Sequence, residues 1–496
     1  MEDNFLLRFP GIGQDIFNKL DNQNVTKCKE VSHLWNSFLK ESKFVWIRKI
    51  HTYQNYYIAF KEDWRLVLTR IPLETAKELA IAVKKFSKIK SAIHPSNLTK
   101  TSNPTTPALP ILQTFDNQYS PAHVVAGSGS ISLWKHIEER LADSNPKKKD
   151  GISAYHLAAQ EGNLEICRSI INNAVENKCP KDITGKTPLH KAASRGHYDV
   201  CQLILENIEI KNPVDDNGLT PLDVAASFGH LEIYQLIEKM AEIKDISGVN
   251  GKTPLHWAAF GGHLEMCRYI AGKLENKNPT TNAGETPLCI AVKMGFFEVV
   301  EYFSHHTQDK NPRCRDDFTP LHEAATIGHF KIFKHIAENL ENINPPNFYG
   351  QTPLHAAAYQ GHLDIAKYIL ANSEDASPID GINRGTPLHL AAHNGHFEVF
   401  KVILEKVVNK NPGSQAFWTP LHSAANFGYY EICKLILSYV DEPNPKTRNG
   451  QTPLSLALKN GNIPIRDLLL ESIAKKRREA LINKRWKCRS KKKNIR

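Results

Sequence analysis

The chain has 496 residues, of which 41% are hydrophobic and 23% are charged. This composition is typical of a soluble protein, and the length predicts about three domains or one long repeat array. No apolar run approaches the roughly 20 residues of a membrane helix, and the acidic start, MEDNFLLRFP, argues against a secretory signal. Nine irregularly spaced cysteines do not make a disulfide framework, so we expect a reducing compartment, cytoplasmic and/or nuclear.

The formal net charge of +11 is confined to the C-terminus. Residues 474–496 contain twelve basic residues and one acidic residue, so the rest of the chain sums to zero. A nucleic-acid-binding fold would spread its basic residues over a folded face. The charge distribution therefore argues against such a fold.

Residues 1–60 form the first predicted module, with two or three short helices in residues 9–50. Apolar residues recur there at three- and four-residue steps, as in Val25, Cys28, Val31, Trp35 and Phe38. The segment begins with Phe-Pro, continues with I-F-x-x-L-D and V-S-x-x-W, and ends on a distal Trp. This pattern resembles an F-box, although Phe9 stands where that family usually has Leu.

The F-box resemblance implies docking to a Skp-family adaptor within a cullin-RING ubiquitin ligase. It assigns the adaptor-facing or motif-core positions to Pro10, Ile16, Leu20, Val31, Trp35 and Trp46. The alternative is a small helical cap in which the tryptophans are simply buried. Residues 61–116 then form a connector, helical over 61–90 and rich in Pro, Ser, Thr and Asn beyond.

A repeat of 33 residues organises residues 117–473. Thr-Pro-Leu recurs at a spacing of 33 residues, with one spacing of 34, and its threonines are Thr187, Thr220, Thr253, Thr286, Thr319, Thr352, Thr386, Thr419 and Thr452. Degenerate matches at Ser120 and Ser153 bring the count to about eleven units. A Pro seven residues before the Thr and a Gly two before it predict a turn, and a Gly nine after it predicts the left-handed end of a first helix. A second helix follows, so each repeat is a turn and two antiparallel helices that must stack on neighbours.

The recurring pattern TPLHxAAxxGH resembles the ankyrin repeat. The resemblance covers about 70% of the chain and implies an all-α solenoid of helix pairs with β-hairpin-like tips and a concave groove. It also implies protein–protein binding without intrinsic catalysis. We therefore expect a substrate-recruiting ligase subunit whose array holds a protein target, or alternatively a ligase-independent scaffold.

Several enzyme-like or metal-like motifs are explained by the repeat. Gly-Lys-Thr at 185–187 and 251–253 lacks the earlier Gly of a phosphate-binding loop, and Thr326 stands where a zinc helix needs its second His. Fourteen of the 22 histidines occupy fixed repeat positions, which predicts hydrogen bonding to loop backbone. Four cysteines share one position and are predicted to be buried, namely Cys167, Cys201, Cys267 and Cys433. We expect no cofactor, metal site, catalytic residue or small-molecule substrate.

Positions that stacking does not require are the candidates for partner binding. By resemblance they are the tip residues four, three and one before the Thr, and the helix residues seven and eight after it. Several are aromatic, as in interface hot spots: Phe228, Phe260, Phe318, Phe348, Tyr349, Tyr359, Trp418 and Phe427. The alternative is that some of these rings cover neighbouring repeats.

The basic tail, residues 474–496, contains two clusters, made up of Lys475, Lys476, Arg477 and Arg478 and of Lys491, Lys492 and Lys493. Three interpretations stay open. The tail extends the last helix or is disordered, it serves nuclear import, or it binds a polyanion such as nucleic acid or an anionic membrane.

Overall fold

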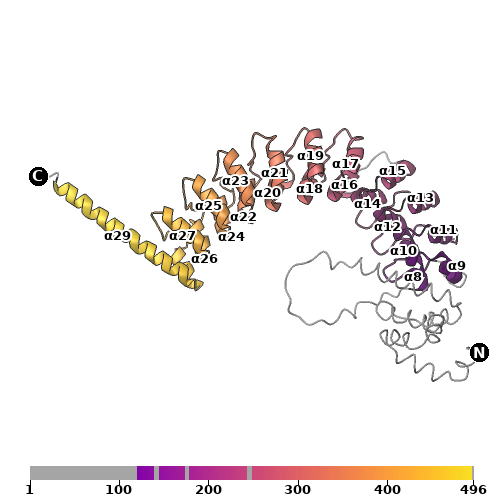
Figure 1. Ribbon diagram of the computed structural model, residues 1–496, viewed down its shortest axis with the longest axis horizontal. Helices are drawn as coiled ribbons and strands as arrows, with labels where there is room; N and C mark the ends of the chain where they lie inside the picture. The colour runs from indigo at the N-terminus through magenta and orange to yellow at the C-terminus, as the bar shows by residue number, and fades with distance from the viewer. Residues whose placement is uncertain (1–119, 139–144, 174–177, 243–247, 494–496) are drawn as a thin grey trace, which may run out of the picture. The chain divides into compact units, whose positions relative to one another are not determined.

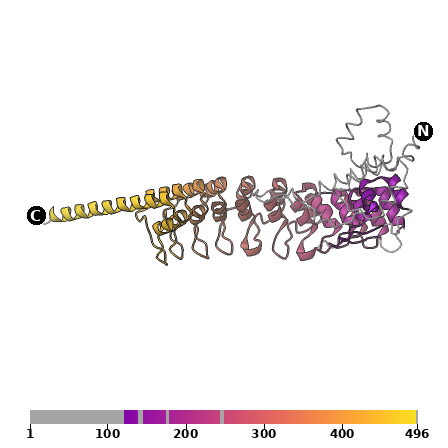
Figure 2. The same cartoon turned by 90° about the horizontal axis from the view of Figure 1, so that it is seen from below.

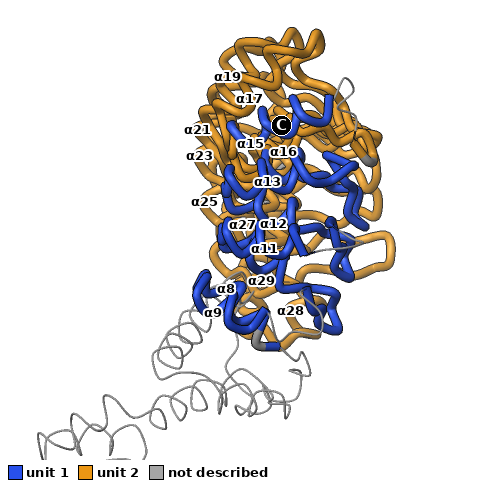
Figure 3. Tube along the Cα trace, turned by 90° about the vertical axis from the view of Figure 1, so that its right-hand side faces the viewer, with its two compact units in different colours: residues 1–225, 232–243 blue, residues 226–231, 244–496 orange. Residues whose placement is uncertain are grey.

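The computed structural model describes residues 120–138, 145–173, 178–242 and 248–493. These residues form α-helices and two 3₁₀ turns, and the described ranges contain no β-strand (Figure 1). The F-box-like module and the connector predicted in residues 1–116 lie outside the described residues. The chain divides into two compact units, residues 1–225 with 232–243 and residues 226–231 with 244–496 (Figure 3).

The helices alternate between the first and second position of each repeat. In the first unit they are α8 (Pro121–Ser128), α9 (Ile131–Glu138), α10 (Ala154–Gln160), α11 (Leu164–Asn173), α12 (Pro188–Arg195) and α13 (Tyr198–Asn207). The division between the units falls within the next pair, α14 (Pro221–Phe228) and α15 (Leu231–Met240).

The second unit continues the same alternation. It comprises η3 (Val249–Gly251), α16 (Pro254–Gly261), α17 (Leu264–Ala271), α18 (Pro287–Met294), α19 (Phe297–His306), η4 (Arg315–Asp317), α20 (Pro320–Ile327), α21 (Phe330–Ala337), α22 (Pro353–Gln360), α23 (Leu363–Asn372), α24 (Pro387–Asn394), α25 (Phe397–Lys406), α26 (Pro420–Phe427), α27 (Tyr430–Tyr439), α28 (Pro453–Lys459) and α29 (Ile463–Lys493).

The repeat motif sets both ends of each first helix, as α20 illustrates. Thr319 is the N-cap, and Pro320 takes the first helical position, where its missing N–H costs nothing. Gly328 ends the helix at φ +92°, and a Cβ there would lie 2.4 Å from the His362 ring. Only glycine fits both the backbone and the space, so the predicted left-handed end is confirmed.

Stacking of equivalent helices buries the core. In the second unit the first helices α16, α18, α20, α22, α24, α26 and α28 pack in succession, and the second helices from α17 to α29 do the same. Paired alanines such as Ala324 and Ala325 are fully buried, because small side chains let the first helices approach closely. The prediction for the equally spaced cysteines is confirmed, since all four are fully buried: Cys167, Cys201, Cys267 and Cys433.

The loops between repeats project to one side of the helices of the second unit (Figure 2). These loops close as hairpin-like turns, and most of them donate one backbone hydrogen bond to the preceding tip. Examples are the amide of Asn282 to the carbonyl of Asn250 at 2.9 Å and the amide of Phe348 to the carbonyl of Asp316 at 2.9 Å. We call this series of bonds the tip ladder. It links the tips without forming regular strands.

Candidate protein-binding surface

A histidine three residues after the repeat Thr joins most repeats to the next. In α20 the amide of Thr319 donates to Nδ1 of His322 at 3.2 Å, so the opposite nitrogen, Nε2, donates to the carbonyl of Gln351 in the next tip at 3.0 Å. Seven other histidines make the same two bonds: His123, His156, His190, His256, His355, His389 and His422. The predicted hydrogen bonding to loop backbone is confirmed for these residues.

Burial keeps these imidazoles neutral. Loss of hydration lowers the pKa of His322 to about 4, and its hydrogen bond to the Gln351 carbonyl only partly opposes that shift. At neutral pH both ring nitrogens are already occupied. The repeated histidines are therefore structural, and they leave no free nitrogen for metal binding or proton transfer.

In most repeats a polar residue lies five before the repeat Thr, and in several of them it fixes the shape of the tip. Oδ1 of Asn347 accepts hydrogen bonds from the amides of Tyr349 and Gln351, each at 2.9 Å. In the first unit Oδ1 of Asp215 accepts in the same way from Asn217 and Leu219. The tips are thus held in one conformation by their own side chains, which is the preorganisation that a binding surface needs.

Six of the eight aromatic residues predicted to bind a partner are exposed: Phe228, Phe260, Phe348, Tyr349, Tyr359 and Phe427. Phe348 is 73% exposed and Tyr349 is 41% exposed, and their rings meet edge to face with centroids 5.3 Å apart. This pair lies on the tip that Asn347 fixes. Phe348 is the most exposed residue of the predicted partner-binding set.

The other two predicted aromatic residues, Phe318 and Trp418, are half-buried. The Phe318 ring stacks on His322 with centroids 4.9 Å apart, and Trp418 stacks on His422 at 5.3 Å. The Trp418 indole also donates to Oγ of Ser423 at 2.8 Å. Both rings lie over the histidine of their own repeat, so each has a packing contact within the array.

Phe417 is an exposed aromatic residue that the sequence interpretation missed. It occupies the position two before the repeat Thr, where most repeats have Gly, and its backbone has φ +58°. Its side chain is 57% exposed. A bulky residue in the left-handed region is strained, and such strain concentrates at functional sites. The signal in the sequence is the missing Gly of that tip.

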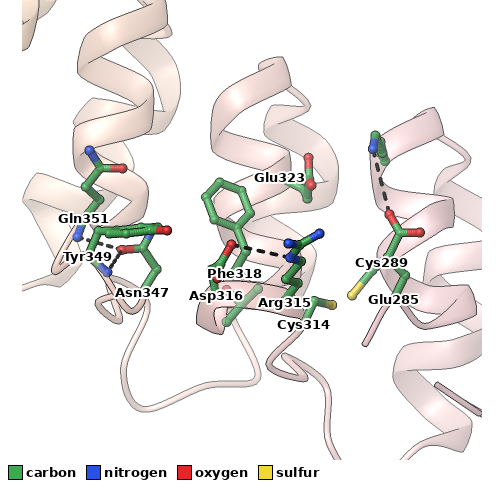
Figure 4. A pocket seen from close by; sticks show the side chains of 12 residues that line it. Glu285, Cys289, Cys314, Arg315, Asp316, Phe318, Glu323, Asn347, Tyr349 and Gln351 are labelled. Atoms are coloured by element: carbon green, nitrogen blue, oxygen red, sulfur yellow. Dashed lines mark hydrogen bonds and ion pairs between the residues drawn. The ribbon is translucent and has the colours of Figure 1, made fainter. Parts of the chain in front are cut away.

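A pocket of about 330 Å³ lies beside the tips of the repeats that begin at Thr286 and Thr319 (Figure 4). Charged side chains line it, and Nζ of Lys293 lies 4.0 Å from Oε1 of Glu285. Phe318 and Tyr349 also line it. Within the described residues no group of three or more His, Cys, Asp or Glu side chains is placed to hold a metal ion.

The basic tail continues the last helix. Helix α29 runs from Ile463 to Lys493 without interruption, through the boundary predicted at residue 474. Lys475, Arg477 and Arg478 are exposed, whereas Nζ of Lys476 lies 2.9 Å from a carboxylate oxygen of Asp441. The second basic cluster falls within α29 and consists of Lys491, Lys492 and Lys493.

The adaptor-facing positions predicted from the F-box resemblance lie outside the described residues. They are Pro10, Ile16, Leu20, Val31, Trp35 and Trp46. No helix among the described residues has both the length and the apolar character needed to cross a membrane.

Comparison with known families agrees with the stacked helix pairs. The family model described as ankyrin repeats in three copies matches six overlapping segments, residues 122–213, 155–247, 234–314, 308–380, 372–447 and 388–480. A search of curated proteins finds no match to the chain. The matched segments span residues 122–480, well over half of the sequence. The chain belongs to the ankyrin-repeat family, and its helical array is a scaffold for binding other proteins.

Proposed function

We propose that this protein recruits a target protein to a cullin-RING ubiquitin ligase. The array would hold the target, and the F-box-like segment in residues 9–50 would bind a Skp-family adaptor and, through it, the cullin. The chain would do no chemistry of its own. Holding the target near the ligase raises its effective concentration there, which is sufficient for catalysis by proximity.

The exposed aromatic pair Phe348 and Tyr349 carries the target-binding half of this proposal. Rings that the stacking of helices does not require, presented on a tip held by Asn347, have the character of interface hot spots. The motif of residues 9–50 carries the ligase half. Without adaptor binding, the same surface supports the alternative, a scaffold that acts independently of a ligase in the cytoplasm or nucleus.

Replacing Trp35 tests the ligase half. We expect the full-length chain to bind a purified Skp-family adaptor, and Trp35→Ala to weaken that binding at least about tenfold, because a buried aromatic anchor at an interface typically contributes 2 kcal/mol or more. Biolayer interferometry would measure both affinities. Phe427→Ala, an exposed change in the array, is the control and should leave adaptor binding unaltered.

If the wild-type chain fails to bind the adaptor, or if Trp35→Ala binds equally well, the ligase half is wrong. The protein would then be the ligase-independent scaffold.

Removing the aromatic pair tests the target-binding half. The double change Phe348→Ala with Tyr349→Ala should lower the affinity for a protein target by about 30-fold or more. A loss of this size corresponds to loss of a hot spot. Quantitative mass spectrometry of proteins captured by each variant would measure the effect. Tyr439→Ala is the matched control, because Tyr439 is exposed to a similar degree but lies at the end of α27. Equal recovery of every target by all three chains would contradict the proposed surface.

A further inference from the structure

Two cysteines replace two structural residues of the repeat where the repeats beginning at Thr286 and Thr319 meet. We call this contact the 286/319 junction. Cys289 takes the position that holds the bridging His in eight other repeats. Cys314 takes the position five before Thr319, which is Asp, Asn, Thr or Ser in most other tips and caps the turn in several of them. Both departures fall at the same junction.

Without an imidazole, the 286/319 junction lacks the histidine bridge and contains a pocket. At the junctions on either side, Nε2 of His256 reaches the carbonyl of Glu285 and Nε2 of His322 reaches that of Gln351. A cysteine side chain is too short to make this bond. The pocket of about 330 Å³ lies here, with both cysteines in its lining.

The tip ladder is also interrupted at this junction. The neighbouring tips are joined by the Asn282–Asn250 and Phe348–Asp316 backbone bonds. In the described part of the chain no equivalent bond joins Arg315 to Ala283. The tip that carries Cys314 therefore lacks two of the connections that hold its neighbours, the histidine bridge and the ladder bond.

The two thiols face each other across the junction. Their sulfur atoms point toward each other in Figure 4, and both side chains line the pocket. Sγ of Cys314 donates a weak hydrogen bond to the carbonyl of Pro312 at 3.9 Å. Oγ1 of Thr286 donates to Sγ of Cys289 at 3.3 Å. Cys289 is 5% exposed, whereas Cys314 is half-buried and borders the pocket, so a small oxidant has a route to the pair.

The surroundings of Cys289 favour its reactive, ionised form. The adjacent Cys314 side chain and then the hydrogen bond from Thr286 lower the pKa of Cys289, against the opposing effect of burial. The core cysteines behave in the opposite way, since burial raises the pKa of Cys267 and of Cys433 to about 12. The junction thus combines a favoured thiolate with an adjacent second thiol.

We propose that Cys289 and Cys314 are a reversible redox site that forms a disulfide in response to hydrogen peroxide. The Cys289 thiolate attacks one peroxide oxygen, the O–O bond breaks, and hydroxide leaves and takes up a proton to become water. The Cys314 thiol then attacks the resulting sulfenic acid, the S–OH bond breaks, and a second water leaves. Two thiols and one hydrogen peroxide give one disulfide and two waters, and a dithiol reductant reverses the change. Transient disulfides of this kind are compatible with a reducing compartment.

The disulfide would supply a covalent link at the one described junction of the second unit where the histidine bridge and the ladder bond are both missing. It would tie α18 to the tip of the next repeat. This inference does not depend on ligase recruitment, because it concerns only the array.

Peptide mapping of the full-length chain tests the proposal. The protein is treated with about one equivalent of hydrogen peroxide, blocked with N-ethylmaleimide and digested without reductant. We expect the Cys289–Cys314 cross-linked peptide to be the dominant disulfide product, to exceed any other cysteine pair at least about tenfold, and to disappear after dithiothreitol. Cys289→Ser and Cys314→Ser should each abolish it, and Cys267→Ser should leave it unchanged.

The wild-type measurement decides the question even if a serine variant fails to fold. Oxidation of Cys289 to a sulfinic acid without a cross-link would overturn the proposal. A spread of disulfides among all cysteines, with no preference for this pair, would overturn it equally. The same would follow if the cross-link persisted in Cys289→Ser.

Discussion

Lowering the pH from 7 to 5 is expected to destabilise the repeat array by several kcal/mol. The pKa of six buried histidines is lowered from 6.5 to about 4, first of all by burial: His156, His190, His256, His322, His355 and His422. Because the folded pKa lies below the unfolded one, the unfolded chain takes up protons first as the pH falls. The stability is fully present above about pH 6.5 and is lost between there and pH 4. Between pH 7 and pH 5, each imidazole accounts for a loss on the order of 1–2 kcal/mol in the free energy of unfolding.

One buried carboxyl group opposes this trend. Asp223 replaces the bridging His in its repeat, and burial raises its pKa to about 6. Its protonated form is therefore favoured in the folded state, so its contribution to stability falls as the pH rises through 6. This is one group against six histidines, and the net effect remains acid destabilisation.

Urea unfolding followed by circular dichroism at several pH values would measure the effect. His322→Asn should reduce the pH dependence of the unfolding free energy by up to about 1.4 kcal/mol per pH unit, which is the limit for one proton. His306→Gln, which changes an exposed histidine on α19, should leave it unaltered. A urea midpoint that stays constant between pH 7 and pH 5 would contradict the contribution of the buried histidines to the pH dependence of stability.

Phe400→Ala should cost about 3–5 kcal/mol of unfolding free energy, the usual range for a fully buried aromatic side chain. Phe400 lies on α25 and is completely buried. The equivalent positions in the adjacent repeats are Ala366 and Cys433, which are also fully buried. Such small neighbours cannot expand into the space, so the cavity would stay largely empty.

Guanidinium chloride unfolding of the full-length chain would measure this loss. Phe417→Ala is the control, because it removes the same side chain from an exposed tip, and it should change stability by about 0.5 kcal/mol or less. Equal destabilisation by the two changes would mean that the core around α25 is not packed as described.

The repeating part of the fold could be predicted from the sequence because its signals are local. Thr-Pro at a helix start and Gly at its end act within a few residues, and the same pattern recurs at least nine times. The histidine bonds and the buried cysteines follow from equal position in equal repeats. In the recurring Asn-Pro, the Pro indicates a turn, whereas the role of the Asn is visible only in the structure. In the structure this Asn accepts from an amide ten residues later, as Asn311 does from Leu321 at 3.1 Å.

The candidate sites depend on exceptions to the repeat, which a sequence pattern does not place in space. Cys289 and Cys314 occupy different positions of successive repeats, and only the stacked structure brings them together. The sequence leaves open whether Phe318 and Trp418 bind a partner or cover the array, and the structure adds that each ring stacks on a histidine of its own repeat. The F-box-like module stays a prediction, because its residues lie outside the described ones.

The stacking of each helix pair on its immediate neighbours also bears on how the chain is made. In the second unit the substantial helix contacts join elements of the same or adjacent repeats, so they span no more than about one repeat in sequence. Low contact order favours rapid folding, and domains fold from the N-terminus as the ribosome releases them. Each newly synthesised repeat could pack on the preceding repeat, which is already folded. It would not need the C-terminus of the chain to be synthesised first.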